Sequence, residues 1–186
     1  MALLIAGVVM WSLVHLVPGL LPAVKKRWIN MVGNNGYQAT FSILIVLSLV
    51  MIVYGWRHAI PEHIYTLPAV ANQLAMVLMV IAFLLFGAAI VPSRINSYLR
   101  HPQLLSVFIW SFAHLLVNGD SRSIVLFCGM GVWAVLEIIL INRREDVWNK
   151  PARPGLRKEA LSIAVSLAFL VVAVLAHPYI AGVAIR

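Results

Sequence analysis

Long hydrophobic stretches alternate with short polar ones along the whole chain. Six stretches are apolar enough for a membrane helix: 2–21, 40–54 (extending to 57), 69–91, 103–117, 123–141 and 160–176 (extending to 183). An α-helix rises 1.5 Å per residue, so about 20 apolar residues cross the hydrocarbon layer. The fourth stretch is short for a span. The pattern predicts an all-α fold, a polytopic transmembrane bundle of about six helices that forms one domain over 1–186.

Helix-breaking residues stand between these stretches. Pro92 ends the third, and Asn118-Gly119-Asp120 forms a turn between the fourth and the fifth. The remaining prolines that mark boundaries are Pro18, Pro22, Pro61, Pro68, Pro151 and Pro154, and Pro178 is expected to kink or end the sixth helix. The loops are too short to bury a core of their own, so any site should lie in the membrane or at its surfaces.

Composition agrees with a membrane protein. Of 186 residues, 62% are hydrophobic and 11% charged, whereas soluble domains carry roughly a quarter charged residues. The net charge of +8 is explained by basic residues that flank helices, and no aromatic-interleaved basic patch indicates nucleic-acid binding. Membrane lipid is therefore the expected surrounding.

The basic residues also predict an orientation. Eleven lysines and arginines fall in the loops after the first, third and fifth stretches, and only Arg57, Arg122 and Arg186 fall on the other side. The positive-inside rule places the eleven in the cytoplasm and both termini outside it. This predicts a multi-pass membrane protein, and the side that holds the termini is the periplasm if the cell is a Gram-negative bacterium. The first stretch is read as a retained helix because no cleavage site follows it.

Two histidines lie inside apolar stretches, where a polar side chain is costly. His15 and His114 each stand about two-thirds along their segment, so we expect them at similar depth and facing each other. Two imidazoles from different helices are the usual axial ligands of haem b in a bundle. The alternative is that each imidazole only bonds a backbone carbonyl or a hydroxyl group. His177, near the outer end, is a weaker third candidate.

The residues around His114 add a candidate site. Trp110, His114 and Asn118 recur every four residues and share one helix face, so Trp110 could flank a planar cofactor and Asn118 orient an imidazole or a substrate. A packed tryptophan and an asparagine that ends the helix explain the pattern equally well. Asp120 is expected to cap the next helix, with a role in a site as the alternative. His101 is either a surface residue or a contact to a ligand's polar end.

Two further side chains inside apolar stretches need an explanation. Glu137 is expected to form an ion pair with Arg94, Arg100 or Arg144, and a proton relay is the alternative. Cys128 is the single cysteine, which excludes a disulfide within the chain and any site built from several cysteines. We expect it to be a packing residue.

The central motif resembles a known family. Arg100-His101-Pro102 followed by Trp110, His114 and Asn118-Gly119-Asp120, then Leu126-Phe127 and Trp133-Ala134, is similar to the NnrU family of bacterial membrane proteins. His15 with Lys25-Lys26-Arg27, and Tyr54-Gly55-Trp56-Arg57, fit its other helices. The resemblance covers about 5–147. It implies a role in nitrite and nitric oxide metabolism, the process for which the family is named.

The family is also related to 15-cis-zeta-carotene isomerase, a membrane haem b enzyme. The resemblance implies that His15 and His114 correspond to haem-ligating histidines. Three hypotheses follow: a haem-binding protein that supports denitrification, a haem-dependent cis–trans isomerase of a carotenoid-like polyene, and a cofactor-free assembly factor for a reductase partner.

Overall fold

The computed structural model describes residues 1–145 and 147–183, and helices account for almost all of their regular structure. The elements, in chain order, are α1 (Ala2–Leu20), α2 (Pro22–His58), α3 (Val70–Ile90), the 3-10 turn η1 (Arg94–Ser97), α4 (Pro102–Val117), α5 (Ser121–Ser123), the π-helical turn η2 (Ile124–Cys128), α6 (Gly129–Arg144) and α7 (Leu156–Ala181). α5, η2 and α6 form one continuous rod, Ser121–Arg144. All six predicted helices are thus confirmed.

The second helix differs most from its prediction. It begins at Pro22 rather than near residue 40, and it is interrupted at Gly33, whose φ of 74° lies in the left-handed region. Glycine adopts this conformation without the steric cost that a Cβ would bring. The segment before Gly33 carries the basic residues Lys25, Lys26 and Arg27, so it is a separate helical arm before the apolar span.

Two prolines that were expected at helix boundaries lie just inside the ends of their helices. Pro18 lies inside α1 and Pro178 inside α7, each within the last turn. A proline this near the end of a helix removes only one of its last hydrogen bonds. The expectation that these residues mark helix boundaries is correct to within three residues.

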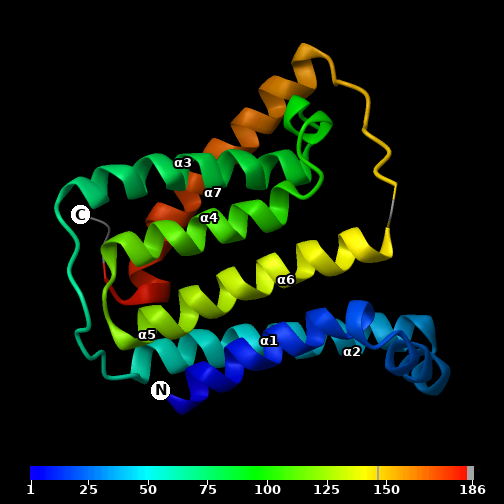
Figure 1. Cartoon of the computed structure of the whole chain (residues 1–186), viewed down its shortest axis with the longest axis horizontal. Coiled ribbons are helices and arrows are strands. Elements are labelled where there is room, and N and C mark those ends of the chain that lie inside the picture. The colour runs from blue at the N-terminus through cyan, green and yellow to red at the C-terminus, as the bar shows by residue number, and fades with distance from the viewer. Residues whose placement is uncertain (146, 184–186) are drawn as a thin grey trace.

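The helices form two groups that meet along α4 and α6 (Figure 1). α1 packs along α2 and also contacts α6, whereas α3 packs between α4 and α7. Met1, the α2–α3 loop and the turn between α4 and α5 lie at one end of the bundle, here called the outer end (Figure 1). The loops that hold the eleven basic residues lie at the opposite, inner end. Arg186, counted in the orientation argument, is outside the described residues.

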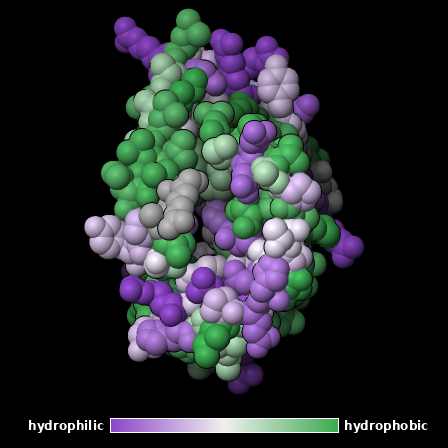
Figure 2. Space-filling model, turned by 90° about the vertical axis from the view of Figure 1, so that its left-hand side faces the viewer, coloured by the Kyte–Doolittle hydropathy of each residue, from purple (hydrophilic) through white to green (hydrophobic). Residues whose placement is uncertain are grey.

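The outside of the bundle suits a bilayer. Among the described residues, five helices are long and apolar enough to cross a membrane, and α4, with 16 residues, is the shorter sixth. Many large hydrophobic side chains point outward, including Leu13, Ile43, Val77 and Leu175. The outer end shows hydrophilic and hydrophobic residues intermixed (Figure 2). The chain is therefore a multi-pass membrane protein.

The α2–α3 loop is attached to the turn after α4 by backbone hydrogen bonds. The Gly119 carbonyl accepts from the amides of Ile64, at 2.7 Å, and Tyr65, at 3.1 Å, while the Ser121 amide donates to the Glu62 carbonyl at 2.9 Å. The Tyr65 hydroxyl also donates to the carbonyl of Leu115 in the last turn of α4. We call this set of contacts the outer clamp. It fixes the end of α4 just beyond His114.

Candidate functional site

His15 lies in an aromatic cluster between α1 and α6. Its imidazole contacts Trp11 with ring centroids 4.3 Å apart, Trp133 at 5.0 Å and Phe41 of α2 at 5.5 Å. Trp11 and Trp133 also meet edge to face at 5.5 Å. Trp133 is buried, so this cluster belongs to the interior of the bundle.

His114 lies in a second cluster, near the outer end of α4. Phe127 of η2 stacks on its imidazole, with centroids 4.4 Å apart and an interplanar angle of 25°. Trp110, one turn earlier, contacts both rings at 5.0 Å. Because a π-turn adds a residue to the helical repeat, η2 changes which side chains of the rod face α4. This turn carries Phe127 to the histidine.

The two histidines share one hydrogen-bond arrangement. The Nδ1 atoms of His15 and His114 lie 2.9 Å from the carbonyl oxygens of Trp11 and Trp110, four residues earlier. A carbonyl can only accept, so Nδ1 carries the proton and Nε2 of the neutral ring keeps its lone pair. This is the tautomer that metal-ligating histidines adopt when the backbone orients them. Each Nε2 is thus chemically able to bind a metal ion.

The backbone positions of the two histidines are at different depths. α1 runs parallel to α6, because Gly129 packs on Val8 and Gly19 packs on Leu140, whereas Gly131 packs on Ser111 of α4. This register places His15 beside residue 136 of α6 and His114 beside residue 128, about 12 Å apart along the helix. The expectation of similar depth is wrong: two-thirds along α1 and two-thirds along α4 are different levels, because the two helices run in opposite directions. Helical side chains lean toward the N-terminus of their helix, so the two imidazoles lean toward each other's level.

Three other predicted residues have partners of their own. Asn118 Nδ2 donates to the His114 carbonyl at 3.0 Å, so its amide ends α4. Asp120 accepts from the Ser123 amide and hydroxyl, at 3.0 and 2.8 Å, and so caps the next helix. His101 Nε2 lies 2.8 Å from Asn142 Oδ1, which ties α4 to α6 near the inner end. Each of the three side chains thus has a partner within the protein, and a role of Asn118, Asp120 or His101 toward a ligand stays a prediction.

Glu137 does not form the ion pair with Arg94, Arg100 or Arg144 that was expected. Among the described residues the ion pairs near it use Glu145 instead, which lies 3.4 Å from Arg100 and 3.2 Å from Arg144. Glu145 is in the loop after α6, where Arg144 and then Arg100 lower the pKa of its carboxyl. Glu137 lies two turns before the end of α6, and its Oε2 is buried with no hydrogen-bond partner in the described part of the chain. The arginines prefer the exposed carboxylate because it stays hydrated.

The other polar candidates lie at the edges of the bundle. Cys128 is exposed rather than packed in the core. It borders an apolar groove of about 380 Å³ between α1 and α6, which Trp133 also lines. His177 lies inside α7 with its Nδ1 2.7 Å from the Val183 carbonyl. Neither residue joins the two aromatic clusters.

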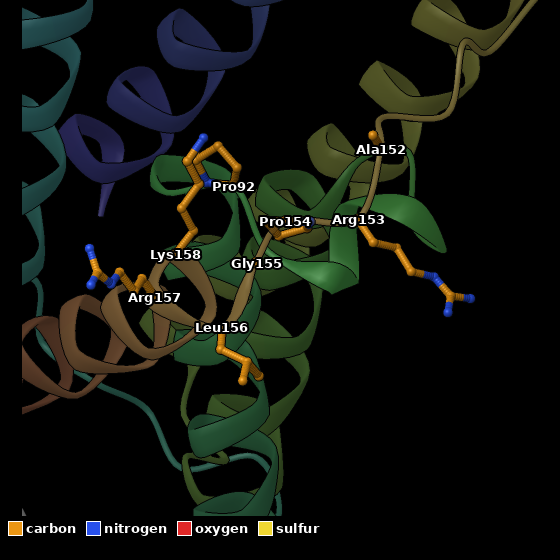
Figure 3. A pocket seen from close by; sticks show the side chains of 8 residues that line it. All are labelled: Pro92, Ala152, Arg153, Pro154, Gly155, Leu156, Arg157 and Lys158. Atoms are coloured by element: carbon orange, nitrogen blue, oxygen red, sulfur yellow. The ribbon is translucent and has the colours of Figure 1, made fainter.

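A basic hollow lies at the inner end. It measures about 670 Å³ and is lined by Pro92 and by 152–158. Figure 3 shows that Arg153, Arg157 and Lys158 extend in different directions from it. Because the three charged groups do not converge on one point, the hollow is not arranged to hold a single anion.

Four residues that contact the two histidines were not predicted as part of a candidate site: Trp11, Phe41, Trp133 and Phe127. One signal for Trp11 was present in the sequence, since Trp11-x3-His15 repeats the spacing of Trp110-x3-His114. We call these two units the α1 and α4 Trp-His units. Phe127 had no such signal, because its place depends on the π-turn, which residue patterns do not reveal.

The comparison with known families decides what kind of protein contains these units. The model described as NnrU protein matches residues 3–185. The chain belongs to the NnrU family. This membership covers nearly all of the chain, so both Trp-His units and the outer clamp lie within the family domain. Neither the curated proteins nor the solved structures gave a match.

Proposed function

We propose that this NnrU-family protein binds haem b in the membrane through Nε2 of His15 and His114. The observation that carries the proposal is the shared arrangement of the two Trp-His units, in which each Nδ1 is bonded to a carbonyl and each Nε2 keeps its lone pair. The surrounding aromatic and aliphatic side chains suit the apolar macrocycle. The resemblance to haem-ligating relatives at the same two positions supports it.

The chemistry of the donor atoms and of their surroundings fits haem. Both donors are imidazoles and both sit in aromatic surroundings, which matches an iron porphyrin. Nε2 of His15 and Nε2 of His114 would hold the iron of such a group. The two side chains lean toward each other's level, whereas their backbone positions lie about 12 Å apart along the helix direction.

When bound, haem supplies a one-electron redox centre in the membrane interior. We propose that this centre supports nitrite and nitric oxide metabolism in the bacterial inner membrane, as the family resemblance implies. The chain's own residues would fix the imidazole planes: Trp11 and Trp133 at His15, and Phe127 and Trp110 at His114. Both termini lie outside the cytoplasm in this proposal, because the eleven basic residues then face the cytoplasm.

The absorption spectrum tests the proposal. The protein is purified from haem-replete cells beside His15→Ala, His114→Ala and the exposed control His58→Ala. We expect a Soret band with low-spin α and β bands in the wild type and the control, and loss of the low-spin bands in both site variants if one iron is shared. Loss in only one site variant identifies a single ligand. A colourless wild type, or a band that survives both variants, contradicts the proposal.

A second candidate function is cis–trans isomerisation of a long polyene. The observation that favours it is the apolar groove between α1 and α6, which Trp133 lines while also contacting His15. Incubation of the reduced protein with tri-cis zeta-carotene tests it, and an unchanged isomer composition argues against it. A colourless protein that co-purifies with a reductase subunit would instead indicate an assembly factor.

A further inference from the structure

The helical arm before Gly33 folds back onto the beginning of the α2 span. The ring of Trp28 meets that of Tyr37 edge to face, with centroids 5.0 Å apart, and Lys25 Nζ lies 5.8 Å from the centroid of the same tyrosine. In an uninterrupted helix, residues 28 and 37 would be about 13.5 Å apart along the axis and on opposite faces. The break at Gly33 therefore turns the arm across the first turns of the span.

The arm lies at one surface of the membrane. Leu21 is the single residue between it and the end of α1, and both α1 and the apolar part of α2 are long enough to cross a bilayer. α1 and α2 pack along each other, so the segment that joins them stays at one end of the bundle. Figure 1 shows the arm at the inner end, beside the end of α1. This is the level of the lipid headgroups.

The arm has one apolar face. Val24, Trp28 and Met31 are spaced by four and three residues and therefore share a side of the helix, whereas Lys26 and Asn30 lie on the opposite side. Val24 is 46% exposed and Met31 is 74% exposed, so little of the protein covers this face. A helix with an apolar face that includes tryptophan, and with lysine and arginine around its polar face, is typical of helices that lie in the membrane interface.

The basic residues of the arm, 25–27, have no ion-pair partner in the part of the chain that the structure describes. The carboxylates described in and after the α6–α7 loop are engaged elsewhere. Glu145 pairs with two arginines, and Glu159 accepts from the Ser93 hydroxyl at 3.0 Å and from the Arg94 amide at 2.8 Å. The three positive charges of the arm therefore need counter-charges from outside the described chain, and headgroup phosphates are the anions nearest to this surface.

We propose that the arm, 22–32, is an interfacial helix that binds anionic phospholipids of the leaflet at the inner end. Val24, Trp28 and Met31 enter the upper part of the acyl chains, at the depth that tryptophan favours. The charged groups of residues 25–27 contact the headgroup phosphates, and their aliphatic stems extend along the apolar layer. Neither set of contacts involves haem, so the proposal is independent of haem binding.

The depth of the two faces is measured with nitroxide labels on the full-length protein in vesicles of phosphatidylcholine and phosphatidylglycerol. Met31→Cys and Asn30→Cys, each in a Cys128→Ser background, carry the label on opposite faces. We expect the label at 31 to collide mainly with oxygen, which dissolves in the bilayer, and the label at 30 mainly with a water-soluble nickel chelate. Labels that respond alike overturn the proposal.

The choice of lipid is measured with spin-labelled phosphatidylglycerol and phosphatidylcholine, as the fraction of each that the protein immobilises. We expect a several-fold preference for phosphatidylglycerol that falls to about one when the three charges of the arm are removed. A control variant removes three charges elsewhere at the inner end and should keep most of the preference. The arm variant is Lys25→Gln/Lys26→Gln/Arg27→Gln, and the control is Arg153→Gln/Arg157→Gln/Lys158→Gln.

Two results of the lipid measurement overturn the proposal. One is an arm variant that keeps the wild-type preference, and the other is a control that loses as much as the arm variant. Added salt should weaken the preference of the wild type, because it screens exposed charges. Since both measurements work with haem-free protein, a failed haem experiment leaves them unchanged.

Discussion

The α1 and α4 Trp-His units have the same local chemistry and different surroundings. In each, the imidazole donates to the carbonyl of a tryptophan one turn earlier and touches its ring. In the α4 unit, Phe127 stacks on the imidazole and the outer clamp fixes the end of the helix. In the α1 unit, Trp133 meets the imidazole edge-on, and no comparable clamp follows in the part of the chain that the structure describes. Local spacing thus sets the tautomer, and tertiary contacts set how firmly the ring is held.

The largest difference should come from removing the stacked ring. Phe127→Ala removes a side chain that is 3% exposed and should lower the free energy of unfolding by about 3–5 kcal/mol. Phe41→Ala, the matched change beside His15, should cost about 1 kcal/mol because that ring is only half-buried. Thermal unfolding in detergent measures both. Equal losses would show that the two units are held alike.

The outer clamp can be broken without touching a side chain of either unit. A Cβ on Gly119 would overlap the Tyr65 carbonyl, so Gly119→Ala should cost about 1–3 kcal/mol. Gly155→Ala, where nothing lies within 4 Å of the added carbon, is the control and should be nearly neutral. Hydrogen exchange should quicken in the last turn of α4 and stay unchanged in α1. Unchanged exchange at α4 would show that the clamp does not hold His114.

A smaller effect is expected from one hydroxyl group. Tyr65→Phe removes the hydrogen bond to the Leu115 carbonyl and should cost about 1 kcal/mol. Tyr54→Phe, on an exposed ring in α2, should change stability little. Denaturant unfolding in detergent compares the two variants. A Tyr65→Phe protein as stable as Tyr54→Phe would mean that the backbone bonds alone close the clamp.

The smallest effect concerns pH. Burial raises the pKa of the Tyr65 phenol, and the nearby Cys128 and Asp120 raise it further. The folded state therefore favours the neutral phenol, and this contribution is present below the ordinary pKa of about 10 and is lost as pH rises through the higher folded value. Phenolate absorbance at 295 nm should show a late-titrating tyrosine that is absent in Tyr65→Phe. Identical curves would contradict the shift.

The sequence predicted the fold well because membrane helices can be recognised by their length and hydrophobicity. The six spans followed from this signal, whereas the arm before Gly33 did not, since it is not apolar enough to be read as a span. In the site, the sequence identified His15 and His114 but placed them at one depth. Depth depends on helix direction and packing register, and neither is encoded in the position of a residue within its own segment.

Glu137 shows a second limit. Its charge suggested a partner, and the nearest arginines in the sequence were reasonable choices, yet they pair with Glu145 in the loop. The choice of ion-pair partner depends on hydration as well as on distance, and the sequence does not reveal which carboxylate remains hydrated. The π-turn that places Phe127 against His114 could not be predicted from the sequence either, because one inserted residue leaves the hydrophobic pattern almost unchanged.

The outer clamp has a consequence for how this protein can diverge. Most of its bonds join main-chain atoms of 62–65 and 119–121, which every amino acid except proline can provide. The loop can therefore change much of its sequence while the attachment persists. The steric demand falls on Gly119, where Tyr65 leaves no room for a side chain. Substitutions should accumulate freely around this glycine and rarely at it.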